Sequence, residues 1–250
     1  GGVPTIATVD SVGNVGKFSY IAQTNTNDPR IAYYDETNTS LKFASRVGAN
    51  WTVQTVDNTG DVGQYASLAV DGSGNAHIAY YDATLTALKY AKQTGTTWDI
   101  QFLDITDSVG TYNAIALTDN GFPHIAYYDA TNTAIKYAYW TGSSWIYLIP
   151  DNSADVGQYL SLDVDSAGNS HISYIDMTNN TLRYAIRNVN TWTGQTVTSL
   201  GATTSENEFN LWSLTSSGIY ATSIKVNSAN VPAIAFYHIG NHDLQYAQPW

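Results

Sequence analysis

A repeat of 47 residues constrains this chain more than any other feature. The segment at residues 31–35 (IAYYD) returns at 78–82, at 125–129 and, altered to ISYID, at 172–176, in steps of 47. A more divergent copy, at 234–238, follows after 62 residues and so carries an insertion of 15. Five units and this insertion account for all 250 residues. The repeat therefore predicts one domain made of five similar units.

Each unit reads as four short strands. In the second unit these are expected at 65–71, 75–81, 87–92 and 98–103, in segments rich in Tyr, Val, Ile and Thr. The first two are separated by Asp-Gly-Ser-Gly, residue types that tolerate positive φ in tight hairpins. No window has a 3.6-residue apolar period. The pattern predicts an all-β fold, a five-bladed β-propeller with four antiparallel strands per blade.

The two ends of the chain suggest how the ring closes. Residues 5–10 match the fourth-strand segment 52–57, and residues 244–247 match the third strand of a unit. We expect the N-terminal strand to complete the last blade, because closure leaves no open sheet edge. The single domain, 1–250, then divides into units at about 10–56, 57–103, 104–150, 151–197 and 198–250 plus 1–9.

Composition excludes several functions. The chain has 10 Lys and Arg against 21 Asp and Glu, a net charge of −11, which argues against binding nucleic acid or anionic membranes. Its apolar runs are too short for insertion into a membrane. Without Cys there is no disulfide framework and no Cys nucleophile. Abundant Thr, Asn, Ser, Gly and Tyr with little Lys is typical of an extracellular or cell-surface protein.

Aromatic and imidazole side chains recur in register. A Trp opens the fourth strand of four units, which indicates a place in the core between blades: Trp51, Trp98, Trp145 and Trp192. A His precedes the IAYYD motif in three units, where a buried His bonded to a neighbour is favoured over a metal ring: His77, His124 and His171.

Two rows of Asp allow a structural and a functional interpretation. One ends the second strand: Asp35, Asp82, Asp129 and Asp176. The other ends the fourth strand: Asp10, Asp57, Asp104 and Asp151. Recurring cations at Lys42, Lys89, Lys136 and Arg183 are expected to pair with one row. The carboxylates fix turns, or the first row binds sugar hydroxyls on the top face, where the second-to-third-strand and inter-blade turns lie.

No cofactor is predicted. Ca²⁺ is the alternative, with Asp61 and Asp155 as metal candidates, although these loops supply few of the six to eight oxygens that the ion needs.

The repeat sequence itself resembles a known group. The string GNAHIAYYD at 74–82, followed by LKYA at 88–91 and GTTW at 95–98, resembles repeats of secreted bacterial and archaeal β-propeller proteins. The repeat length and number are also similar to five-bladed lectins of the tachylectin-2 type, which bind amino sugars. None of the motif residues of those lectins occurs here, so this second resemblance implies architecture alone.

The repeat breaks down in the last unit. His238 replaces the second-strand Asp, Thr198 replaces the fourth-strand Asp, and Gln245 replaces the cation. The insertion falls within 199–220 if the first strand is 221–226; a competing register places that strand at 208–214. Under the first register the top rim gathers carboxylate, imidazole and aromatic side chains: Glu206, Glu208, Phe209, Trp212, His238 and His242.

Three functions remain open. The leading one is a secreted or cell-surface binding module, lectin-like, whose partner is a glycan, with Asp35, Asp82, Asp129, Asp176, Trp212 and His238 as ligand-binding candidates. The second is a glycoside hydrolase or polysaccharide lyase at the top rim of the last blade, with Glu206, Glu208, His238 and His242 as catalytic candidates. The third is a structural or adhesive module of a larger surface protein. The sequence does not predict the oligomeric state.

Overall fold

The computed structural model describes residues 6–189, 191–200, 222–238 and 243–248. These residues form five antiparallel sheets of four, four, four, four and three strands, each sheet built from consecutive strands. We number the sheets as blades 1 to 5. The strands are β1 (Val15–Gln23), β2 (Pro29–Asp35), β3 (Ser40–Val47), β4 (Asn50–Asp57), β5 (Val62–Val70), β6 (Ala76–Asp82), β7 (Ala87–Thr94), β8 (Thr97–Asp104), β9 (Val109–Leu117), β10 (Pro123–Asp129), β11 (Ala134–Trp140), β12 (Trp145–Asp151), β13 (Val156–Val164), β14 (Ser170–Asp176), β15 (Thr181–Asn188), β16 (Thr191–Ser199), β17 (Thr222–Val226), β18 (Pro232–His238) and β19 (Asp243–Ala247).

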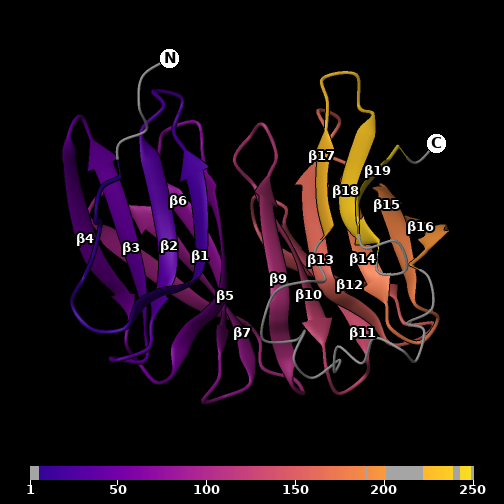
Figure 1. Ribbon diagram of the computed structural model, residues 1–250, viewed down its shortest axis with the longest axis horizontal. Helices are drawn as coiled ribbons and strands as arrows, with labels where there is room; N and C mark the ends of the chain where they lie inside the picture. The colour runs from indigo at the N-terminus through magenta and orange to yellow at the C-terminus, as the bar shows by residue number, and fades with distance from the viewer. Residues whose placement is uncertain (1–5, 190, 201–221, 239–242, 249–250) are drawn as a thin grey trace.

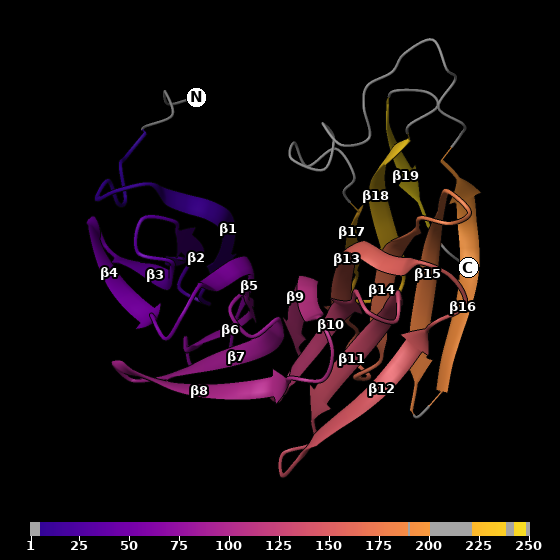
Figure 2. The ribbon, with the colours of Figure 1, turned by 90° about the horizontal axis from the view of Figure 1, so that it is seen from below.

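The sheets stand side by side around a common axis, which confirms the prediction of a five-bladed propeller (Figures 1 and 2). The first strands of successive blades, β1, β5, β9, β13 and β17, contact one another along the axis. The fourth strands lie on the outside (Figure 2). The part of the chain that is described contains no helix long and apolar enough to cross a membrane.

The first strands of blades 1 to 4 each carry a bulge that turns an aromatic side chain toward its neighbours. The register of β5 against β6 shifts between Gln64 and Ser67, and Tyr65 between them has φ +53°. The same strained backbone recurs at Phe18, Tyr112 and Tyr159. Their rings follow one another from blade to blade, with centroids 4.8, 5.1 and 4.7 Å apart. The repeated strain is offset by this row of aromatic contacts along the inner strands.

Apolar cores fill the spaces between neighbouring blades. The core between blades 1 and 2 joins Leu41 and Phe43 to Leu68 and Ile78, all buried, with Trp98 packed against it. Similar cores lie between the later pairs of blades. Trp98 meets the preceding blade at Phe43, Trp145 at Tyr90 and Trp192 at Tyr137, in edge-on contacts of 5.0–5.4 Å. Three of the four recurring Trp residues thus belong to the cores between blades, as predicted: Trp98, Trp145 and Trp192.

The chain ends do not meet as expected. Residues 6–9 form no strand and Ile6 is 98% exposed, so the predicted pairing of this segment with residues 244–247 is absent. β19 pairs only with β18 in the described residues, and its Leu244 and Tyr246 are exposed. The N-terminal segment lies beside blade 1, away from β19, in both views (Figures 1 and 2). It is held there through Asp10, which accepts a hydrogen bond from Tyr33 Oη at 2.7 Å and pairs with Lys42.

Candidate functional site

The predicted top-face carboxylates are engaged within the protein. Asp35, Asp82, Asp129 and Asp176 are 0–2% exposed. Each accepts a hydrogen bond from the backbone N–H three residues later, at 2.9–3.0 Å, and so fixes the turn after the second strand. These contacts fit the interpretation that this row of Asp residues fixes turns. Its role in ligand binding stays a prediction.

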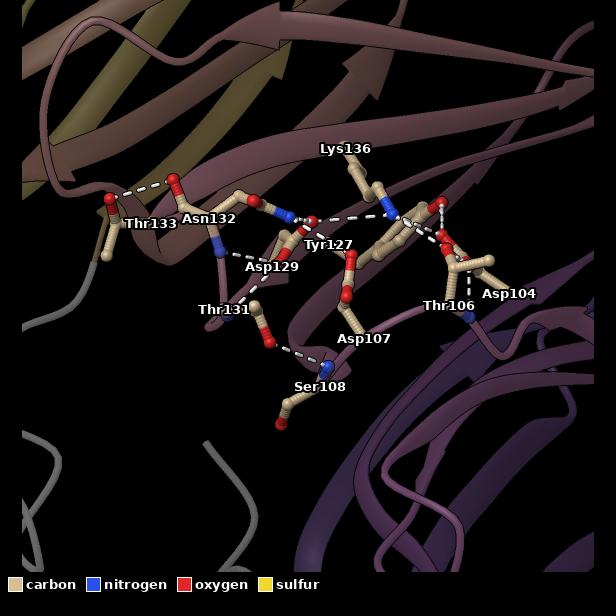
Figure 3. Close-up of polar contacts among 10 residues, drawn as sticks. All are labelled: Asp104, Thr106, Asp107, Ser108, Tyr127, Asp129, Thr131, Asn132, Thr133 and Lys136. Atoms are coloured by element: carbon tan, nitrogen blue, oxygen red, sulfur yellow. Dashed lines mark hydrogen bonds and ion pairs between the residues drawn. The ribbon is translucent and has the colours of Figure 1, made fainter.

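The second Asp row joins blades 1, 2 and 3 each to the blade that follows it. Asp104 ends blade 2 and accepts hydrogen bonds from Tyr127 Oη at 2.8 Å and Lys136 Nζ at 3.0 Å, both in blade 3 (Figure 3). Lys136 also lies 3.4 Å from Asp129. Burial raises the pKa of Asp104, but hydrogen bonds from Thr106, Lys136 and Tyr127 outweigh it and hold the pKa below its usual value. We call this Asp–Tyr–cation group the interblade latch.

The latch recurs wherever the sequence repeats its residues. Its members are Asp10 with Tyr33 and Lys42, Asp57 with Tyr80 and Lys89, Asp104 with Tyr127 and Lys136, and Asp151 with Tyr174 and Arg183. The pairing predicted between the cations and an Asp row is therefore present. Where blade 5 follows blade 4, Thr198 and Gln245 stand at the Asp and cation positions.

The metal candidates have protein partners. Asp61 accepts a hydrogen bond from Tyr34 Oη at 2.7 Å, and Asp155 accepts the equivalent bond from Tyr128 Oη at 2.7 Å. Within the described ranges, no three His, Asp or Glu side chains cluster so that they could hold an ion. A Ca²⁺ role for either carboxylate stays a prediction.

The candidates of the last blade fall mostly outside the described residues. Glu206, Glu208, Trp212 and His242 are among the residues that the structure does not describe. His238 ends β18 and is half-buried. The predicted rim is therefore not assembled by the described residues, and its catalytic and ligand-binding roles stay predictions.

A cavity of about 430 Å³ opens between blades 2 and 3 on the bottom face, the face with the turns inside each blade after its first and third strands. We call it the blade 2/3 cleft. Two turns border it, at residues 71–73 and 119–122, together with side chains from β7, β8, β11 and β12. Its lining residues are Asp71, Gly72, Ser73, Tyr90, Lys92, Asp99, Gln101, Asp119, Asn120, Gly121, Phe122, Pro123, Trp140 and Trp145.

Aromatic rings make up much of the apolar wall of the cleft. Trp140 ends β11 and faces Trp145 across the β11–β12 pair, with ring centroids 5.7 Å apart. Trp145 in turn contacts Tyr90 of blade 2 at 5.4 Å, and its indole N–H donates to Gln101 Oε1 at 3.2 Å. These contacts hold Trp145 in place. Trp140 and Phe122 are half-buried, so both keep accessible surface at the cleft.

Polar groups surround these rings. Asp71 is committed to its own hairpin, where it accepts from the backbone N–H groups of Ser73 and Asn75 at 2.9 Å. Burial raises the pKa of Asp71, but hydrogen bonds from Asn75, His77 and Ser73 hold it below its usual value. Asp99, Asp119 and Lys92 are exposed at the cleft, and Asp99 accepts a hydrogen bond from Gln101 Nε2 at 2.9 Å. The cleft thus offers aromatic surface, two accessible carboxylates and one ammonium.

The behaviour of Tyr90 and His77 bears on whether the cleft is catalytic. The Tyr90 hydroxyl lies 2.6 Å from His77 Nδ1, and both residues are buried. Burial, with the charges of Asp99 and Asp71, raises the pKa of Tyr90, and burial lowers the pKa of His77. A neutral phenol and a neutral imidazole therefore fill this position at pH 7. Blade 4 repeats the pair as Tyr184 and His171, at 2.7 Å, so the arrangement serves the blade rather than one site.

Sequence reasoning missed this cleft. The signal is present in the 47-residue register, in which Phe122 and Pro123 replace Asn75 and Ala76, and Trp140 takes the position of Gln93. These departures become meaningful only when β11 and β12 bring Trp140 and Trp145 opposite each other. The departures singled out in the sequence lie in the last unit, and ligands were expected on the top face.

The comparisons with known proteins identify the fold. Neither a scan against protein-family models nor a search of curated proteins found a match to this chain. A lectin from Aleuria aurantia, solved with Fucα1-6GlcNAc, is similar with a TM-score of 0.60 and 16% identity, covering 92% of this chain and 74% of the lectin.

A protein of unknown function from Dyadobacter fermentans has a TM-score of 0.62 and 11% identity, covering 93% of this chain and 78% of that one. An ulvan lyase bound to -[GlcA(1-4)Rha3S]- has a TM-score of 0.54 and 11% identity, covering 92% of this chain and 69% of the lyase. At these identities the likeness is one of fold.

Proposed function

We propose that the protein is a carbohydrate-binding module whose binding site is the blade 2/3 cleft. The observation that carries the proposal is the meeting of Trp140 and Phe122 with exposed Asp99 and Asp119 around one cavity of about 430 Å³. Sugar rings present C–H groups that pack on aromatic faces, and hydroxyls that donate to carboxylates. Clefts that combine apolar walls with a few polar groups are the usual form of small-ligand sites.

The similar structures support a glycan as the ligand class. The Aleuria lectin was solved with a fucosyl disaccharide and the ulvan lyase with an acidic polysaccharide fragment. A glycan partner is also in keeping with a place outside the cell or at its surface, which we propose with it.

Binding without catalysis is favoured at this cleft. The Asp71 carboxylate accepts hydrogen bonds within its own hairpin, and the Tyr90 phenol stays protonated beside a neutral His77. An enzyme needs an acid or base poised near the working pH. The alternatives, a hydrolase or lyase at the last-blade rim and an adhesive module of a larger protein, remain hypotheses for other parts of the molecule.

The test is a glycan array followed by calorimetry with the glycans that bind. Trp140→Gln introduces the residue that blade 2 carries at this position, Gln93, and should weaken binding about tenfold or more, the usual cost of losing an aromatic anchor. Arg46→Gln changes the same position of blade 1, where the side chain is exposed, and serves as the matched control. A chain that binds no glycan, or a Trp140→Gln variant with unchanged affinity, would refute the proposal.

A further inference from the structure

A second cavity, of about 440 Å³, opens between blades 2 and 3 on the top face, opposite the blade 2/3 cleft. It lies where β8 and β12 end and the turn after Asp104 leads into blade 3. We call it the upper pocket. The latch residues Asp104, Tyr127 and Lys136 line it (Figure 3). Apart from Thr106, its other lining residues are apolar or aromatic: Leu103, Ile105, Tyr147, Leu148 and Ile149.

Two positions that line the upper pocket have changed from polar to apolar. Ile105 stands where the turns after blades 1 and 3 have asparagine, and Leu148 stands where the other fourth strands have glutamine. Ile105 and Tyr147 are 66% and 48% exposed, so apolar surface lies open to solvent here. Apolar surface that a fold leaves exposed around a hollow is a mark of an interaction site. The residues replaced in the 47-residue register are Asn58 and Asn152, and Gln54, Gln101 and Gln195.

A third change concerns the ring that covers a latch cation in blade 2. Phe102 pairs with Lys89 across β7 and β8, and its ring lies over the Lys89 ammonium, with 4.7 Å between Nζ and the ring centroid. In blade 3, Ile149 takes the position of Phe102, and Lys136 takes that of Lys89. The place of an aromatic ring is therefore taken by a smaller, branched side chain at the edge of the upper pocket.

The exposure of the latch cations follows the residue at this position. The Lys89 side chain, with Phe102 over it, is 2% exposed. The other three cations have side chains that are 12%, 17% and 19% exposed, and none of them has a ring at this position: Lys42 with Thr55, Lys136 with Ile149, and Arg183 with Thr196. The Phe102 ring thus accounts for the cover over Lys89. At Lys136 that cover is missing where a cavity lies.

The charges in the upper pocket favour a neutral ligand. The three N–H groups of the Lys136 ammonium have three acceptors, Asp104 Oδ2 at 3.0 Å, Thr106 Oγ1 at 3.1 Å and Asp129 Oδ2 at 3.4 Å. The ammonium therefore has no N–H left for a ligand, but its positive charge still attracts the π face of an aromatic ring. Two carboxylates beside one ammonium leave the group negative, which disfavours an anion.

We propose that the upper pocket binds a neutral compound with one aromatic ring, which lies over Lys136 as Phe102 lies over Lys89. Blade 2 holds the same ring, cation and latch carboxylate together within this protein. The cavity is large enough for a small ligand, since such sites have volumes of about 300–1,000 Å³. Ile105 and Ile149 supply apolar contacts at its rim. This site is separate from the proposed glycan site and does not depend on it.

The experiment titrates the intact protein at pH 7 with phenol, with cyclohexanol and with benzoate. Cyclohexanol matches the size of phenol without its π face, and benzoate carries a negative charge. Binding is followed by the methyl ¹H–¹³C signals of Ile105 and Ile149, assigned from their loss in Ile105→Val and Ile149→Val. We expect phenol to shift both signals and to bind about two- to fivefold more tightly than cyclohexanol, the ratio for a cation–π contact at an accessible site. Benzoate should bind more weakly than phenol.

Variants place the ligand over Lys136. Ile149→Phe builds the arrangement of blade 2 into blade 3, and its ring should fill the pocket and abolish the shift of the Ile105 signal by phenol. Thr55→Phe places a ring at the same position of blade 1, opposite Lys42, and is the matched control that should leave phenol binding unchanged. Trp140→Gln, which alters the blade 2/3 cleft, should also leave it unchanged.

Four results would overturn the proposal. They are no shift of the Ile105 and Ile149 signals below the phenol concentration that unfolds the protein, cyclohexanol that binds as tightly as phenol, benzoate that does so, and undiminished phenol binding by Ile149→Phe. The first three are measured on the wild type and do not depend on how a variant folds. Failure of the protein to bind any glycan bears on the proposed function and not on this pocket.

Discussion

The interblade latch at Lys89 allows a strong test of what holds the blades together. Lys89 is 1% exposed, and its ammonium lies 2.5 Å from Asp57 of blade 1 and 3.7 Å from Asp82 of its own blade. Lys89→Met keeps the apolar stem but leaves two buried carboxylates without their cation. Removing one partner of a buried ion pair costs about 3–5 kcal/mol. For a chain of this size that corresponds to a fall in Tm of roughly 6–20 °C.

Thermal melts of a matched series check this reasoning. Lys136→Met removes the equivalent cation in blade 3, whose side chain is 17% exposed, and should cost less because water partly solvates the carboxylates left behind. Asp57→Asn combined with Lys89→Met should recover part of the loss, because it removes one of the two stranded charges. If Lys89→Met melts within about 2 °C of the wild type, or if the double variant is no better than the single, the latch does not stabilise the fold as described.

Three further outcomes are expected. Acid should destabilise the fold. A hydrogen bond from Lys42 is the main cause that lowers the pKa of the latch carboxylate Asp10 to about 2, so this group stabilises the folded state fully above about pH 5 and loses that contribution as the pH falls through the folded pKa. Urea melts from pH 7 to 2 would reveal the loss. Gly63→Ala should cost at least about 2 kcal/mol, because φ is +108° and the new Cβ would lie 2.7 Å from Leu41 Cα, whereas Gly48→Ala, in open space, should cost less in the same melts. Asp10→Asn should lower the Tm more than deletion of residues 1–9, since residues 6–9 form no strand. A larger loss of Tm on deletion would instead support the prediction that the N-terminal segment pairs with the last blade.

The sequence predicted the blades well because their determinants are local and repeated. Tight turns such as 71–74 and alternating apolar residues recur every 47 positions, so the strands assigned in one unit predict those of the other units. The similarity of residues 5–10 to 52–57 was correct about Asp10, which takes the latch position against blade 1. It was wrong about strand pairing, because pairing depends on the distant β19 rather than on the segment itself.

The sites were harder to predict because they depend on single departures from the repeat. Trp140 and Ile149 replace Gln93 and Phe102 of blade 2, and neither forms a motif with its neighbours in sequence. Trp140 acquires its setting from Trp145 across the strand pair, and Ile149 from the latch cation Lys136. Residues repeated in every unit, such as the Asp rows, are by contrast the ones that the common fold itself uses.

The direction of the latch has a consequence for how the chain folds. Every latch Asp comes before the residues it binds, by 23 positions for the Tyr and 32 for the Lys, as with Asp10, Tyr33 and Lys42. Each of these latch contacts therefore becomes possible once the following blade has been made. During synthesis, blades 1 to 3 each present their latch Asp before the next blade leaves the ribosome. Assembly can proceed from the N-terminus in steps of one blade, with little time for exposed strand edges to aggregate.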